Sequence, residues 1–248
     1  MVQPALDLRR QPWRYPGPSV RAPGLLADGR YVRCDHSRIR AILDESGHTP
    51  LEHRTPVVAV GSNACAAVMS HKLAGHDGPI VFLVDVVAGV AVGHSAHRSR
   101  AHRSRAHRSR RLPVAGSMRP GFIPAAPYAD AGARDAFVIT MLDDEQLAVI
   151  DATEPNYFRD RVSGARLGPV WLYRSRWGVL APPGAKPVPL TPQPVLERFL
   201  TGHRLGIGPP VAGAFADVAG LREAGWARAD GLDRRASRPG GEMGSAGD

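Results

Sequence analysis

Residues 55–75, TPVVAVGSNACAAVMSHKLAG, limit the possible folds more than any other part of the chain. The β-branched run at 55–60 predicts a buried strand, and the alanine-rich run that follows it predicts a helix. Asn63 stands where a helix N-cap residue is expected. With Gly61 and Ser62 it would form a tight turn that joins a strand directly to a helix.

The remaining predicted elements alternate between strand and helix without the regular repetition of βαβ units. Short apolar or alternating runs predict strands, and capped amphipathic runs predict helices. The predicted strands are residues 80–87, 88–94, 121–128, 136–142, 170–173 and 177–180, and the further predicted helices are residues 35–47, 143–153 and 194–201. We therefore expect one α+β domain built on a curled, mostly antiparallel sheet.

The composition changes at both ends of the chain. Residues 1–25 are rich in proline and arginine and show no hydrophobic period, which predicts a flexible N-terminal segment. Residues 229–248 are rich in arginine, glycine, serine and aspartate, which predicts a disordered tail. The single domain is expected between them, over residues 26–228, with residues 96–111 inserted as a loop.

A five-residue unit, AHRSR, occurs three times in residues 96–110 and is followed by Arg111. The formal net charge is +9, and these residues hold seven arginines, so the rest of the chain carries only 9 − 7 = +2. Arginines can contact nucleic-acid phosphates, but no aromatic residue is interleaved here to stack on bases. The spacing of the histidines does not place them on one face of a helix or strand, so no metal site is expected. We expect a solvated loop.

Cysteine usage and hydropathy predict a cytoplasmic protein without membrane contact. Two cysteines, Cys34 and Cys65, do not make a disulfide framework. The N-terminal residues lack the apolar core of a secretory signal. The longest apolar stretch, residues 79–93, is interrupted by Asp85 and is too short to span a bilayer. Lysine occurs only twice among 32 basic residues, which is typical of a G+C-rich bacterial genome.

The turn at residues 61–63 is the first candidate site. A glycine at a strand end, followed by a helix, presents unpaired backbone N–H groups near the positive end of the helix dipole. Such a turn can hold a carboxylate or a developing oxyanion. The alternative is an ordinary strand-to-helix turn that binds no ligand.

Glu154 is the second candidate. The spacing of Leu147, Ile150 and Glu154 places all three on one helical face, which puts a carboxylate on the face predicted to be buried. Pro155 follows and favours an extended conformation at the helix exit. A partly desolvated carboxylate there could accept and return a proton. The alternative is a solvated glutamate at a frayed helix end.

Together these two segments resemble the gamma-glutamylcyclotransferase superfamily. Its members carry a first strand that ends in aromatic-Gly-Ser-Asn and a later segment of the form Leu-Asp-x-x-Glu-Gly. This chain has VVAVGSN at 57–63 and LDDEQLAVIDATEPNY at 142–157. The resemblance covers about residues 55–180 and implies a small barrel-like mixed sheet flanked by helices. The chain departs from the family pattern at Val60, where an aromatic residue is usual, and at Pro155, where glycine is usual.

The resemblance also implies a reaction and its residues. A gamma-glutamyl amine or amide would cyclise to 5-oxoproline and release a free amine, with no metal or organic cofactor. Glu154 would be the catalytic acid and base. The residues implied to cradle or contact the substrate are Val60, Gly61, Ser62, Asn63, Tyr157 and Tyr173.

We therefore carry three hypotheses, in this order. The first is a cyclotransferase-like enzyme that acts on a small gamma-glutamyl-type substrate. The second is a non-catalytic member of the same fold that binds a small metabolite or a protein partner. The third, and the weakest, is nucleic-acid binding through the arginine repeat.

Overall fold

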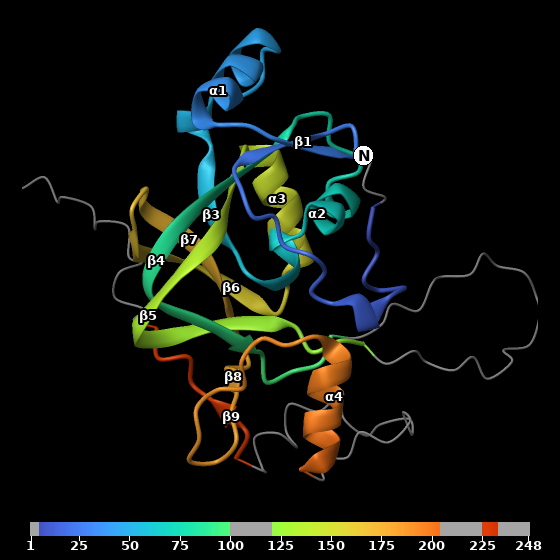
Figure 1. Cartoon of the computed structure of the whole chain (residues 1–248), viewed down its shortest axis with the longest axis vertical. Coiled ribbons are helices and arrows are strands. Elements are labelled where there is room, and N and C mark those ends of the chain that lie inside the picture. Colours follow the sequence, from blue (N-terminus) through green and yellow to red (C-terminus); the bar gives the residue numbers. More distant parts are fainter. Residues whose placement is uncertain (1–4, 100–120, 204–224, 233–248) are drawn as a thin grey trace, which may run out of the picture.

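The computed structural model describes residues 5–99, 121–203 and 225–232 (Figure 1). Residues 100–111 of the arginine repeat and residues 233–248 of the predicted tail lie outside this part of the chain. The described helices are α1 (His36–Glu45), α2 (Ala66–Lys72), α3 (Asp144–Thr153) and α4 (Gln193–Gly202). Figure 1 shows α1 and α4 at opposite ends of the molecule, with α2 and α3 side by side against the sheet.

Five strands close into a mixed barrel. They are β3 (Thr55–Ala59), β4 (Ile80–His94), β5 (Ala125–Leu142), β6 (Tyr157–Ala165) and β7 (Gly168–Ser175). Their order is β4–β5–β3–β7–β6, and a pairing of Val87 with Ala165 joins β6 back to β4. Strands β3 and β7 run parallel, while the other neighbours are antiparallel. The predicted α+β fold, with a small barrel-like and mostly antiparallel sheet flanked by helices, is confirmed.

Strands β4 and β5 are longer than predicted. The sequence suggested two strands in the place of each, but both are continuous. The pairing register shifts between Ala88 and Val90, so the break in the apolar pattern is a bulge that bends β4 without ending it. The two strands therefore reach from the barrel to the region of α4, and they connect the two ends of the molecule (Figure 1).

Two short strands near the start of the chain extend the sheet, and two near its end form a sheet of their own. Strand β1 (Gly24–Ala27) pairs with β4, and β2 (Arg30–Arg33) pairs with β1. Strands β8 (Val179–Leu180) and β9 (Ala227–Arg228) form a separate two-stranded sheet. No helix in the described part of the chain is long and apolar enough to cross a membrane.

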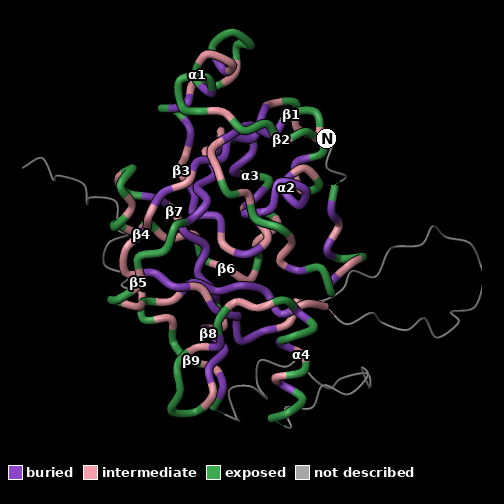
Figure 2. The backbone as a smooth tube through the Cα atoms, viewed as in Figure 1, coloured by how far each residue is buried: buried purple, intermediate pink, exposed green. Residues whose placement is uncertain are grey.

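The central barrel strand β3 is covered on both of its faces. Val57 packs with Met69 of α2 and Ile150 of α3, so one face of the sheet is covered by these two helices. The next residue, Val58, points the other way and clusters with Leu172 of β7, as the period-two alternation of a strand requires. Figure 2 shows buried positions concentrated along these strands, whereas α1 is largely exposed. This burial explains the nearly continuous apolar runs in the sequence.

Helix α2 begins later than predicted. Residues Gly61–Ala64 form a 3₁₀ turn, η3, and Cys65 occupies the N-cap position of α2 without a side-chain cap. The predicted N-cap role of Asn63 is therefore wrong. Its side chain instead contacts Lys72 and Glu154, and these longer-range bonds replace the local one.

The N-terminal segment packs on the barrel, a role that the sequence did not reveal. Leu6, Leu8 and Tyr15 are buried in a cluster that includes Cys65. The Leu6 N–H donates to the Ala67 carbonyl at 2.8 Å, which ties the segment to α2. This packing adds a wall to the cavity described next.

Candidate active site

A cavity of about 1220 Å³ lies where η3, the end of α3 and the N-terminal segment meet. Six of the residues predicted from the sequence line it together, although they come from distant parts of the chain: Val60, Ser62, Asn63, Glu154, Tyr157 and Tyr173. Gly61 is buried in the same turn without lining the cavity. The two candidate segments therefore share one cavity.

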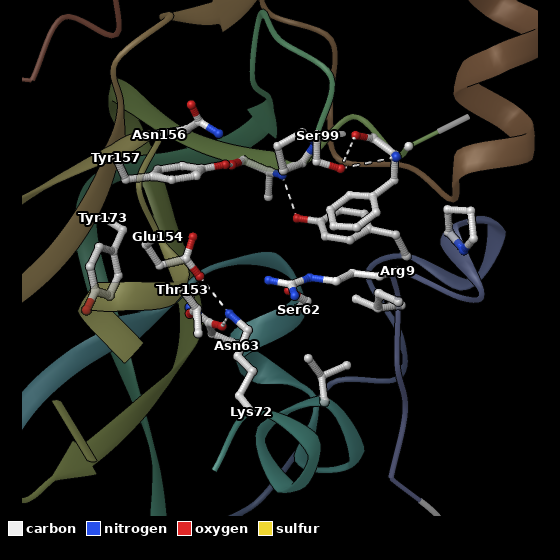
Figure 3. Close-up of a pocket in the computed structure, with 18 of the residues that line it drawn as sticks. Arg9, Ser62, Asn63, Lys72, Ser99, Thr153, Glu154, Asn156, Tyr157 and Tyr173 are labelled. Atoms are coloured by element: carbon white, nitrogen blue, oxygen red, sulfur yellow. Dashed lines mark hydrogen bonds and ion pairs between the residues drawn. The ribbon is translucent and has the colours of Figure 1, made fainter. Parts of the chain in front are cut away.

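The carboxylate of Glu154 forms a polar triangle with Lys72 and Asn63 in this cavity. The Lys72 Nζ is 2.7 Å from the Glu154 Oε1, and the Asn63 Nδ2 donates to the same oxygen at 3.2 Å (Figure 3). Lys72 also donates to the Asn63 Oδ1 at 2.7 Å. The side chains of Glu154 and Lys72 are 15% and 16% exposed. Among the described residues the bonds go to Oε1, so Oε2 remains for a ligand.

The fold explains how these three side chains meet. Glu154 is the C-cap residue of α3, Asn63 lies in η3, and Lys72 is the last residue of α2. Because α2 and α3 pack side by side on the sheet, their ends bring the ammonium and the carboxylate together. Lys72 was not identified from the sequence as a site residue. The only available signal was the rarity of lysine in an arginine-rich chain.

The turn η3 tolerates no side chain at Gly61. Its φ is +62°, in the left-handed region, and an added Cβ would lie 2.7 Å from the Cβ of Ala125 and still closer to the hydroxyl of Tyr15. The Tyr15 hydroxyl oxygen accepts the Ala125 N–H at 2.5 Å. A tyrosine from the N-terminal segment therefore lies directly against the predicted anion cradle.

The two predicted pocket tyrosines are hydrogen-bonded phenols. The Tyr157 hydroxyl donates to the Ala125 carbonyl at 2.8 Å, and the Tyr173 hydroxyl donates to the Asp151 Oδ1 at 2.6 Å. Burial raises the pKa of both phenols well above the usual value, and the carboxylate of Asp151 raises that of Tyr173 further. Both remain neutral near neutral pH and act as fixed walls of the cavity.

The first unit of the arginine repeat forms another part of the wall. Residues 96–99 are packed rather than solvated, and His97 is 4% exposed. The His97 Nδ1 is 2.5 Å from the Ser95 Oγ, which in turn is 2.6 Å from the Ser175 Oγ. Burial lowers the pKa of His97 to about 4, so its imidazole is neutral near neutral pH.

Of the lysine and arginine side chains that line the cavity, two form ion pairs with described carboxylates and one does not. The Arg98 guanidinium is 2.7 Å from the Glu197 carboxylate, and Lys72 is paired with Glu154. The Arg9 side chain forms no ion pair with any described residue. Figure 3 shows it extending into the cavity beside Ser62. The cavity therefore presents an unpaired positive charge near the turn, which suits an anionic group.

No cluster of potential metal ligands occurs among the described residues. The described lining of the cavity includes carboxylates, an ammonium, guanidinium groups, imidazoles and phenols.

Comparisons with known proteins assign no family. No family model matches the chain, and no curated protein matches it. One solved structure, the uncharacterised protein PH0828 from Pyrococcus horikoshii, aligns with 13% sequence identity over 62% of this chain and 99% of that chain. The TM-score of that alignment is 0.32, so the likeness is too distant to carry an argument about fold or function.

Proposed function

We propose that this protein cyclises a small gamma-glutamyl amine or amide to 5-oxoproline and releases the free amine. The observation that supports this proposal best is the shared cavity of Glu154 and the Gly61–Asn63 turn, with 3.2 Å between the Glu154 Oε1 and the Asn63 Nδ2. Cyclisation needs a group that moves a proton and donors that bind an anionic oxygen. Both kinds of group line this cavity.

Substrate binding uses the charges described above. A gamma-glutamyl substrate carries an α-carboxylate, and the Arg9 guanidinium beside Ser62 offers paired N–H donors to it. The substrate also carries an α-ammonium, which must lose a proton before it can attack. The ammonium of Lys72 disfavours a second positive charge nearby, so it assists that loss.

The proton transfers centre on Glu154. Its Oε2 accepts a proton from the α-ammonium, and the resulting amine attacks the γ-carbonyl carbon. The carbon–nitrogen bond of the ring forms, and the carbonyl electron pair moves to oxygen. When the oxyanion collapses, the bond to the departing amine breaks, and Glu154 gives its proton to that amine. The ring nitrogen still carries one surplus proton from the α-ammonium, and Glu154 passes this second proton to the released amine, which leaves as an ammonium ion. Asn63 and Lys72 hold the carboxylate in place through Oε1.

The test is release of 5-oxoproline from a panel of gamma-glutamyl amines and amides, measured by mass spectrometry. Glu154→Gln should lower kcat by about 10²- to 10⁴-fold, the usual size of a general acid–base contribution. The matched control is Glu145→Gln, which removes an exposed carboxylate from the first turn of the same helix. Circular dichroism would establish that both variants fold. Full activity in Glu154→Gln would refute the proposed role.

A second candidate function is binding without turnover. It is favoured by the engagement of the Glu154 Oε1 with both Lys72 and Asn63, which is an arrangement that also suits a static binding site. Wild-type protein that binds 5-oxoproline in calorimetry, but converts no member of the substrate panel, would support this alternative over the enzyme.

A further inference from the structure

Tyr15 is a buried aromatic residue that the N-terminal segment places in the cavity. It is 3% exposed, and its ring stacks on that of Phe122, with 4.3 Å between ring centroids and 13° between planes. Both residues line the cavity. A ring held by burial and stacking has little freedom to rotate, so the position of its hydroxyl is fixed.

The hydroxyl of Tyr15 has a hydrogen left to donate. Its oxygen accepts the Ala125 N–H at 2.5 Å. An N–H donor directed at the phenol oxygen uses its acceptor capacity and leaves its O–H hydrogen for another acceptor. No described residue accepts that hydrogen. Tyr157 differs, because its own hydrogen is already bonded to the Ala125 carbonyl.

The Tyr15 hydroxyl also stays protonated beside Glu154. Burial raises the pKa of Tyr15 above its usual value. The backbone hydrogen bonds of Ala125 and Ser62 lower it in part, and the negative charge of Glu154 raises it again. A neutral phenol with a free hydrogen, next to a carboxylate and a glycine turn, is a preorganised hydrogen-bond donor.

We propose that the Tyr15 hydroxyl is a catalytic residue that donates a hydrogen bond to the γ-carbonyl oxygen of the substrate. This role rests on the proposed function. When the amine attacks, the carbonyl electron pair moves to that oxygen, and the Tyr15 O–H stabilises the charge. When the oxyanion collapses, the carbonyl forms again, and Tyr15 has kept its hydrogen throughout. Glu154 makes the proton transfers of the reaction, whereas Tyr15 transfers no proton.

Tyr15→Phe tests this role, because it removes only the hydroxyl and keeps the stacked ring. We expect kcat to fall by about 10²-fold while KM changes only a few-fold, as for loss of one oxyanion donor. Tyr128→Phe is the matched control, since it removes a phenol from β5 outside the cavity. A purely structural role would lower the melting temperature and leave kcat of the folded protein near that of the wild type. That result would overturn the proposal.

Binding separates this inference from the proposed function. In calorimetry, 5-oxoproline should bind Tyr15→Phe a few-fold more weakly than it binds the wild type, which matches the change expected in KM, because the lactam carbonyl of the product is as neutral as the carbonyl of the substrate. Equal affinity, in an active wild type, would overturn the role of Tyr15 alone. A wild type that neither forms nor binds 5-oxoproline would overturn the proposed function and this role with it.

A labelled side chain keeps the test open if Tyr15→Phe does not fold. Site-specific 3-fluorotyrosine at position 15 preserves the ring and the hydroxyl, and its ¹⁹F resonance reports on the hydroxyl's surroundings. Addition of 5-oxoproline should move that resonance in proportion to occupancy. A resonance that stays in place at saturating 5-oxoproline would contradict contact between Tyr15 and the ligand.

Discussion

Acidification should destabilise the fold through His94, a fully buried imidazole at the end of β4. Its Nε2 accepts the Thr191 N–H at 3.0 Å, and its Nδ1 lies 3.4 Å from the Ile123 carbonyl, to which it donates. In the neutral ring, both nitrogens therefore take part in hydrogen bonds. Protonation of Nε2 would remove the acceptor that the described residues offer to the Thr191 N–H, and it would place a charge at a fully buried position.

The size of the effect follows from two pKa values. Burial lowers the pKa of His94 from 6.5 to about 4, an effect only partly opposed by the Ile123 carbonyl. Between these values the unfolded chain binds more protons than the folded one, so stability falls as the pH drops below 6.5 and the loss levels off below 4. The loss approaches about 3 kcal/mol at low pH and is about 2 kcal/mol at pH 5.

Urea unfolding followed by circular dichroism, at about pH 7.5 and about pH 5, measures this loss. His94→Gln supplies an amide oxygen that can accept the Thr191 N–H without titrating, so its stability should fall by about 2 kcal/mol less than that of the wild type over this interval. His36→Gln, which removes an exposed imidazole at the start of α1, controls for the change of residue type. An equal loss in His94→Gln and wild type would refute the assignment to His94.

Three further predictions concern stability and chain length. Gly61→Ala should lower the free energy of unfolding by about 1–3 kcal/mol in urea titration, because the new Cβ meets Tyr15 in a backbone conformation that alanine avoids. Arg54→Met should cost about 3 kcal/mol in the same assay, because it removes a buried guanidinium and leaves carbonyl oxygens, such as that of Thr49, without the side-chain donor they have in the wild type. Deletion of residues 101–110 should leave the melting temperature and 5-oxoproline release near wild type, since it shortens an insertion between strands. A lost activity in the deletion variant, with the fold intact, would contradict the cavity assignment.

Local sequence signals were sufficient to predict the helices whose N-cap side chains bond to their own first turn. Asp35 accepts the Arg38 N–H at 2.9 Å at the start of α1, as expected from an aspartate before an amphipathic run. Asp143 and Gln146 form a capping box at the start of α3. The buried strand β3 also lies where its apolar run predicts it. In each case the deciding residues are neighbours in the chain.

Features that depend on contacts between residues far apart in the chain could not be predicted from the sequence. Every position of strand β6 is partly exposed or exposed, so its sequence lacks the alternation of buried and exposed residues that identifies a strand. Asn63 looked like a helix cap, but its Oδ1 accepts from Lys72, and its Nδ2 donates to Glu154, 91 residues away. No pattern in the neighbouring sequence marks Tyr15 or Lys72 as a site residue. Their roles follow from the packing of the N-terminal segment and of α2 against the barrel.

The first unit of the arginine repeat has an evolutionary consequence. Its Ser99 N–H donates to the Phe122 carbonyl at 2.8 Å. This hydrogen bond joins the chain just before the intervening residues to the chain just after them. Because the three units are identical, replication slippage that adds or removes whole units leaves the residues that follow β4 unchanged. Descendants of this gene can therefore differ in length at this point while inheriting the same cavity wall.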